Sequence, residues 1–303
     1  MDRSMKRYMK VGTILHVSYK ELGGGEGPIL ECLKKIVTDN YFEAVEVTRM
    51  KDPEVRKEAK KMISMAHMTT AYGGQGLLLG PGLNINDLNE EGRVKAVEAL
   101  KAGIDEAYEM NAIAFEFLAG RYEDATAEES FRALLKSTRE ICEYARSKGD
   151  IMVLCEIFDY DIAKKSLMGP VDRVKRYAEA ICPEYDNFGI QVDLSHIPMI
   201  HETIEENILP IKQYIRLAHM GNTVIKSPEC PAYGDEHPRF GFPNSENDVE
   251  ELAAYLRLLL QIGFLNEKNR PVVSFEVKPF ENEDPDITLA NAKRTLDLAW
   301  ELV

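Results

Sequence analysis

Four side chains that can bind a metal ion lie near the ends of four successive apolar segments in the second half of the chain. They are Glu156 in VLCEIFD, Asp193 in IQVDLSH, His219 in IRLAHMGN and Glu276 in VVSFEVKP. Three carboxylates that lie close together repel one another unless protons or a cation neutralise them. Oxygen ligands together with one imidazole favour Mn²⁺ or Mg²⁺, and they can also bind Co²⁺ or Zn²⁺. If the fold gathers these residues, the sequence predicts one divalent metal site.

The four segments belong to a longer series that predicts the fold. Short apolar segments rich in β-branched or aromatic residues are typical of buried parallel strands. They cover residues 11–17, 44–48, 63–67, 112–118, 151–157, 189–194, 214–219 and 271–277. Segments with the period of an amphipathic helix lie between them, at 27–38, 53–61, 87–109, 126–148, 171–182, 202–212, 246–262 and 286–301.

Strands that alternate with helices along 303 residues predict an α/β protein with a single (β/α)8 TIM barrel. We expect one barrel domain over residues 1–303, with residues 1–10 as an N-terminal extension. A doubly wound sheet is the alternative, but its glycine-rich phosphate turn directly follows the first strand, whereas Gly23, Gly24 and Gly25 come too late. In a barrel the carboxyl ends of all strands meet at one face, where the four polar side chains would converge.

The composition narrows the classes of partner. A formal net charge of −14 argues against a surface built for nucleic-acid phosphates. No apolar stretch approaches the length of a membrane span. The five cysteines are odd in number and fit no disulfide framework, which indicates a reducing compartment. We therefore expect a cytoplasmic protein that acts on a small molecule, and we expect Cys155 to be a packing residue.

The order of these residues resembles the xylose-isomerase-like TIM-barrel superfamily of sugar and sugar-phosphate isomerases and epimerases, which includes the ketose 3-epimerases. The resemblance rests on Glu156, on Asp193 and His196 in a DxxH step, on His219 and on Glu276, and it covers residues 11–302.

That resemblance implies a mechanism. Glu156, Asp193, His219 and Glu276 would hold one divalent ion, with Mn²⁺ preferred. Glu156 and Glu276 would be catalytic, one removing a proton next to the carbonyl of a keto sugar and the other returning it, through an enediolate. His196 would bind a substrate hydroxyl. Family members are often dimers or tetramers, so a homo-oligomer is expected.

Further residues could line the site. Asp235, His237 and Arg239 follow the seventh predicted strand, in AYGDEHPRFG. Asp235 and His237 have three open roles: to bind substrate, to hold the loop, or to form a second metal site with His196. The other candidates for substrate binding come from other predicted strands: His16, His67, Glu116 and Lys278. The glycine-rich loop 68–86 either wraps the substrate or only turns the chain.

Three other functions are consistent with parts of this residue pattern. A lyase that cleaves a 3-keto-glycoside would share the first proton abstraction. An endonuclease IV-like hydrolase would need the Asp-x-His pair, His196 and a histidine on the third strand, for which His67 is the candidate. It would also need a histidine on the fourth strand, where the chain reads AFEFLAG, and the acidic charge opposes DNA binding. A barrel that only binds sugar is the non-enzymatic alternative.

Overall fold

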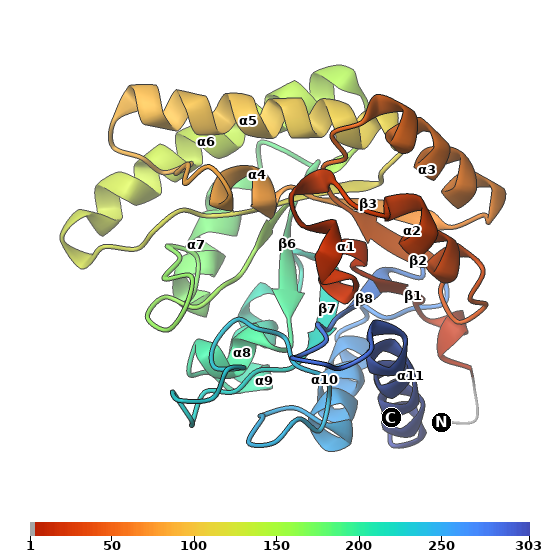
Figure 1. Ribbon diagram of the computed structural model, residues 1–303. Coiled ribbons are helices and arrows are strands. Elements are labelled where there is room, and N and C mark those ends of the chain that lie inside the picture. The colour runs from red at the N-terminus through yellow and green to blue at the C-terminus, as the bar shows by residue number, and fades with distance from the viewer. Residues whose placement is uncertain (1–3) are drawn as a thin grey trace.

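The computed structural model describes residues 4–303, and it confirms the (β/α)8 TIM barrel (Figure 1). All strand pairs are parallel, in the order β1-β8-β7-β6-β5-β4-β3-β2. The strands are β1 Lys10–Thr13, β2 Ala44–Val47, β3 Thr69–Gly73, β4 Ala114–Leu118, β5 Met152–Glu156, β6 Phe188–Asp193, β7 Ile215–Gly221 and β8 Val272–Glu276. A bridge between Ile14 and Glu46 and a hydrogen bond from Glu43 N to Val11 O join β1 to β2 and close the ring.

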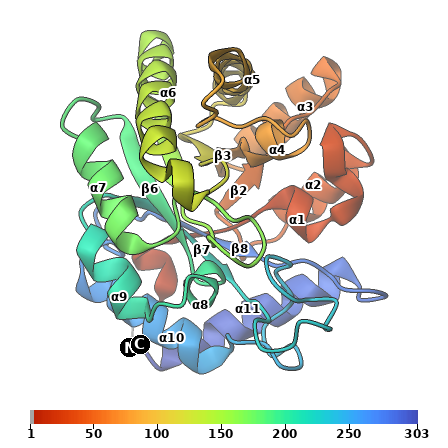
Figure 2. The same ribbon diagram turned by 90° about the vertical axis from the view of Figure 1, so that its left-hand side faces the viewer.

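Helices surround the barrel on its outside (Figures 1 and 2). The α-helices are α1 Leu15–Ser18, α2 Ile29–Val37, α3 Pro53–Met65, α4 Gln75–Leu79, α5 Glu90–Glu109, α6 Ala127–Lys148, α7 Val171–Ile181, α8 His196–Met199, α9 Ile204–Ile208, α10 Val249–Gln261 and α11 Pro285–Glu301. Short 3₁₀ turns lie at Met5–Arg7, Lys20–Gly25, Asp124–Thr126 and Leu209–Ile211.

Local signals explain several of the helix ends. Pro53 opens α3, where its missing N–H costs nothing, and Asp52 caps the same end. Gly149 follows α6, as predicted. The cap of α5 is Asn89, whose side chain accepts from two backbone N–H groups, and so the helix starts three residues after the predicted position 87.

Two predicted strands are wrong in position. The first strand ends at Thr13, and residues 15–17 belong to α1. The third strand is Thr69–Gly73, whereas most of 63–67 is the end of α3. Ile63 is buried on the inner face of that helix and Met65 is exposed, so the apolar residues that suggested a strand follow a helical surface.

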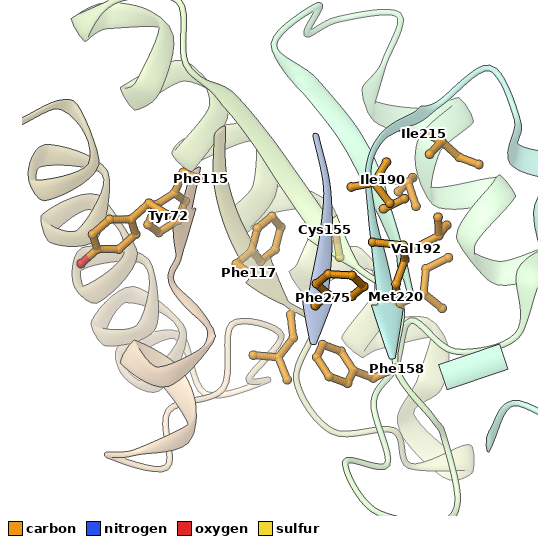
Figure 3. Packing of buried hydrophobic residues seen from close by; sticks show 14 of the residues in the cluster. Tyr72, Phe115, Phe117, Cys155, Phe158, Ile190, Val192, Ile215, Met220 and Phe275 are labelled. Atoms are coloured by element: carbon orange, nitrogen blue, oxygen red, sulfur yellow. The ribbon is translucent and has the colours of Figure 1, made fainter. Parts of the chain in front are cut away.

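The main hydrophobic core lies between the strands and the helices (Figure 3). On β4, Phe115 and Phe117 are fully buried in this core, whereas Glu116 between them lines the pocket inside the barrel. Cys155 alternates with Glu156 in the same way and packs in the core, which confirms the packing role predicted for it. On β4 and β5, alternation therefore points Phe115, Phe117 and Cys155 outward and Glu116 and Glu156 inward, while a separate apolar cluster on the inward-facing side of the strands includes Leu154.

The start of the described chain and the character of the helices complete the description of the fold. Residues 1–3 of the expected N-terminal extension lie outside the described part of the chain, while Met9 is buried and β1 begins at Lys10. Within residues 4–303, none of the helices combines the length and the apolar character that crossing a bilayer requires.

Candidate metal centre and active site

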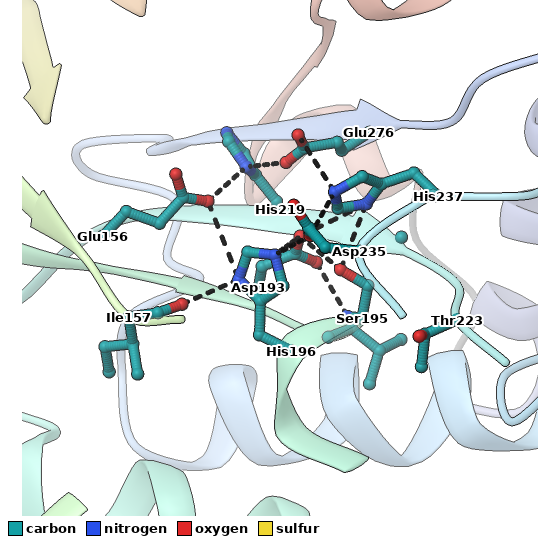
Figure 4. A network of polar contacts seen from close by, with 12 residues as sticks. Glu156, Ile157, Asp193, Ser195, His196, His219, Thr223, Asp235, His237 and Glu276 are labelled. Atoms are coloured by element: carbon teal, nitrogen blue, oxygen red, sulfur yellow. Dashed lines mark hydrogen bonds and ion pairs between the residues drawn. The ribbon is translucent and has the colours of Figure 1, made fainter. Parts of the chain in front are cut away.

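The fold brings the four predicted metal ligands together at the carboxyl end of the barrel (Figure 4). One ligand atom from each of Glu156, Asp193, His219 and Glu276 lies within 4.8 Å of the others. The strand register explains this, because Asp193 is paired with His219 and Glu276 with Gly221 on neighbouring strands. Residues far apart in the sequence therefore meet near the carboxyl ends of neighbouring strands.

His219 lies at the centre of this group. Its Nδ1 is 2.7 Å from Glu276 Oε2 and 3.3 Å from Glu156 Oε1, and its Nε2 is 3.0 Å from Glu46 Oε2. Burial lowers the pKa of His219, but Glu46 and Glu276 outweigh burial and raise that pKa well above its usual range. The carboxylates therefore favour a positive charge at this point.

The pKa values of the Glu276 and Asp193 carboxyl groups shift in opposite directions in the fold. Burial raises the pKa of Glu276, and His237 and His219 only partly oppose it. Burial would also raise the pKa of Asp193, but the neighbouring His196, His237 and His219 lower it. Asp193 additionally accepts hydrogen bonds from Ser195 N at 2.8 Å and from Ser195 Oγ at 2.5 Å, which fix its carboxylate.

The four residues fit a divalent metal ion. Gln75 on α4 donates to Glu156 Oε2 at 2.7 Å, whereas the buried Glu156 Oε1 has no hydrogen-bond partner and faces His219. A buried carboxylate oxygen without a donor is costly unless a cation neutralises it. Three carboxylates and one imidazole are also the donor set of a hard divalent ion such as Mn²⁺.

A second polar cluster adjoins the first. Asp235 Oδ1 is 2.9 Å from His196 Nε2 and 2.8 Å from His237 Nε2, and its Oδ2 accepts from Lys164 Nζ. His237 Nε2 also lies 3.4 Å from Glu276 Oε1, so the two clusters are in contact. One ligand atom each of Asp193, His196 and His237 could hold a further ion, although the Lys164 ammonium already supplies a cation to Asp235.

The charges of this second cluster support one another. Burial would raise the pKa of Asp235, but His237, His196 and Lys164 hold it well below its usual range. Burial would lower the pKa of His196, but Asp193 and Asp235 raise it to about 10. His196 Nδ1 donates to Ile157 O at 2.7 Å, and the ring packs on Phe158 with 4.3 Å between centroids.

A pocket of about 310 Å³ opens over the candidate metal centre. Its wall includes His16, Glu116, His237 and Lys278, all of which were predicted to bind substrate. Burial lowers the pKa of His16 to about 4, so this imidazole is neutral near pH 7, and burial raises the pKa of Glu116 well above its usual range. Lys278 Nζ pairs with Glu236 at the rim.

Three predicted substrate residues do not line this pocket: His67, Arg239 and the buried His196, whose two ring nitrogens are hydrogen-bonded to Ile157 O and Asp235 Oδ1. His67 is exposed, has a positive φ of 54° and follows α3 at the amino end of β3, so its predicted place at a carboxyl strand end is wrong. This also removes the third-strand histidine that an endonuclease IV-like site would need. Arg239 lies outside the pocket lining, and its Nε donates to Glu283 Oε1 at 2.8 Å.

Sequence reasoning missed three residues of the site. Glu46 interrupts the apolar run of β2 as Glu276 interrupts β8, so the same signal was present and was not used. Lys164 and Gln75 lie in segments that follow strands, and only the fold shows that they reach the pocket. Four backbone N–H groups, those of residues 162–165, donate to the buried Asp159 and shape the loop that carries Lys164.

The fold and the site define a class of protein, and comparison with known families agrees. Residues 36–296 match the family described as xylose isomerase-like TIM barrel. The chain therefore belongs to the xylose isomerase-like TIM barrel family. No curated protein matches the chain.

Solved structures of this shape include three informative examples. A D-tagatose 3-epimerase-like protein superposes with a TM-score of 0.71 at 19% identity, over 97% of this chain and 99% of that one. The IolI protein with a bound zinc atom superposes with a TM-score of 0.67 at 14% identity, over 97% of this chain and 96% of that one. The 3-keto-D-glucoside 4-epimerase YcjR of E. coli superposes with a TM-score of 0.63 at 16% identity, over 97% of this chain and 98% of that one. At these identities the likeness is one of fold.

Proposed function

We propose that the protein is a divalent-metal-dependent sugar epimerase or isomerase that moves a proton next to the carbonyl of a keto sugar. The observation that carries this proposal is the convergence of Glu156, Asp193, His219 and Glu276 within 4.8 Å at the base of a pocket. The sugar epimerases among the structural neighbours support the same class of reaction.

Glu156, Asp193, His219 and Glu276 would hold the ion, with Mn²⁺ preferred and Mg²⁺, Co²⁺ or Zn²⁺ also suited to these donors. Such an ion acts as a Lewis acid that acidifies the C–H bond beside a carbonyl and stabilises the resulting negative charge.

Two carboxylates would carry the proton. Glu276 has an oxygen 3.4 Å from His237 and is partly open to the pocket, and burial raises its pKa towards the range in which a carboxylate is an effective base. Glu156 lies at the end of β5, and one oxygen of its carboxylate has no hydrogen-bond donor. One glutamate would take the proton from carbon, and the other would return a proton to the opposite face or to the next carbon.

The remaining groups would bind the sugar. The pocket is at the small end of the size range of ligand sites, which suits a single sugar unit. Asp235 and His237 would hold hydroxyl groups, His196 would orient Asp235 from behind, and Lys164 would add a donor from the loop after β5. His16, Glu116 and Lys278 would contact the substrate from other sides of the same pocket.

Solvent deuterium exchange tests the proposal. Protein prepared with and without Mn²⁺ is incubated in heavy water with a panel of ketoses and 3-keto-glycosides, and products are followed by NMR. We expect Mn²⁺-dependent incorporation of deuterium beside the carbonyl with an intact carbon skeleton. Loss of an aglycone would indicate the lyase instead. Absence of exchange across the panel, although the protein binds Mn²⁺ and sugar, would favour a non-catalytic barrel.

A further inference from the structure

The interior of the barrel contains buried polar residues directly below the candidate metal centre. The four even-numbered strands each contribute one: Glu46, Glu116, Gln191 and Ser274. None is more than 1% exposed. Barrel interiors are usually filled by Val, Ile and Leu, and burying polar groups is costly. Each of the four also has a buried atom without a hydrogen-bond partner. Such a layer does not favour stability, which indicates that these residues have a functional role.

His219 is the residue that this layer surrounds. Gln191 Nε2 lies 3.3 Å from both ring nitrogens, and Ser274 is paired with His219 in the strand register. Glu46 makes the closest contact from below, with Oε2 3.0 Å from Nε2. On the opposite edge of the ring, Nδ1 faces Glu276 and Glu156.

Glu46 is also held in place by the backbone. It is paired with Ala71 on β3, and Ile14 bridges to it where β1 meets β2, at the closure of the barrel. A carboxylate that is anchored on both sides can orient the ring that it touches.

We infer that Glu46 is a positioning residue that accepts a hydrogen bond from Nε2–H of His219 and thereby presents Nδ1 as the metal-binding nitrogen. This inference rests on the proposed metal site. A carboxylate on the far nitrogen of a ligating histidine fixes the tautomer and the orientation of the ring and increases its basicity, and loss of such a partner typically weakens metal affinity about 10–100-fold.

Two variants and one control test this role. Glu46→Leu removes the acceptor at nearly constant volume, whereas Glu46→Gln keeps an oxygen but loses the charge. Ser274→Ala changes the same buried layer without removing a hydrogen-bond partner of His219. The affinity of the metal-free proteins for Mn²⁺ is measured by calorimetry against a competing chelator, and circular dichroism confirms that each variant is folded.

We expect a loss of about 10–100-fold for Glu46→Leu, a smaller loss for Glu46→Gln and a change of less than about twofold for Ser274→Ala. A second readout reports on the tautomer. In Zn²⁺-loaded protein with ¹⁵N-labelled histidine, His219 Nε2 should carry a downfield, protected proton, and Glu46→Leu should shift or remove that signal.

The possible failures are distinct. If the wild-type protein binds Mn²⁺ but both Glu46 variants bind it equally well, or if Ser274→Ala weakens binding as much as Glu46→Leu, the positioning role is wrong and the proposed function is untouched. A Zn²⁺-loaded wild type with its proton on Nδ1 would also overturn the role. If the wild type takes up no divalent ion, the proposed function fails, and the positioning role fails with it.

Discussion

Replacing Asp235 by asparagine should destabilise the protein, because this carboxylate makes the shortest ion-pair contacts of three groups that carry or favour positive charge. Its side chain is 5% exposed and accepts from His196, His237 and Lys164. Asparagine keeps the shape and one acceptor oxygen but removes the charge. The histidines and the lysine would then face one another across a buried amide.

The size of the effect follows from the burial of the partners. Removing one partner of a buried ion pair costs about 3–5 kcal/mol. The Lys164 side chain is 25% exposed and can be partly solvated, so we expect the lower end, about 3 kcal/mol. Lys164→Met combined with Asp235→Asn should cost less than the sum of the single changes, because it leaves no unpaired ammonium.

The effect also has a predicted pH dependence. The pKa of His196 rises from 6.5 to about 10 in the fold, partly through Asp235. A raised pKa contributes stability that is fully present below the unfolded value and is lost as the pH rises through the folded value. The destabilisation by Asp235→Asn should therefore be larger at pH 6 than near pH 10.

Urea denaturation of the metal-free proteins, with a chelator present, measures these differences as free energies of unfolding. The dependence on urea should be the same for all variants, so that the midpoint reports stability. A change in the free energy of unfolding of less than about 0.5 kcal/mol for Asp235→Asn at pH 6, or additivity of the two changes within that margin, would contradict this prediction.

Three further changes test other parts of the structure. Glu276→Gln should reduce turnover by at least about 10²–10⁴-fold, since it removes a proton-transfer group as well as a metal ligand, and near-wild-type turnover would contradict the two-glutamate mechanism. Gly12→Ala should destabilise the protein by about 1–3 kcal/mol in urea denaturation, because its Cβ would lie 2.5 Å from Ser274 Oγ and 3.1 Å from Ala44 Cβ; an unchanged midpoint would contradict this packing. His67→Asn, which keeps a residue tolerant of positive φ, should leave Mn²⁺ affinity and turnover unchanged, and a loss of either would return His67 to the site.

Much of the barrel could be predicted because buried parallel strands are short and apolar and end in polar residues. The strands that end at Glu156, Asp193 and Glu276 were predicted to within one residue at each end. The third strand could not be found in this way. Its sequence, TTAYG, is less apolar than the end of α3 before it, where Ile63 faces the core.

The candidate metal ligands were predictable for a physical reason, since a charged residue in an apolar strand needs a partner. Applied consistently, the same reasoning would have found Glu46. The role of Lys164 was out of reach, because its position depends on how the loop after β5 folds around Asp159 and meets Asp235. Loop shape is set by backbone hydrogen bonds that leave no periodic pattern in the sequence.

We propose that one divalent ion is shared by Glu156, Asp193, His219 and Glu276. Anomalous diffraction from a crystal grown with Mn²⁺ tests it most directly. We expect a single strong peak within bonding distance of all four side chains, on the Nδ1 side of the His219 ring. A peak elsewhere, or none at saturating Mn²⁺, would contradict it.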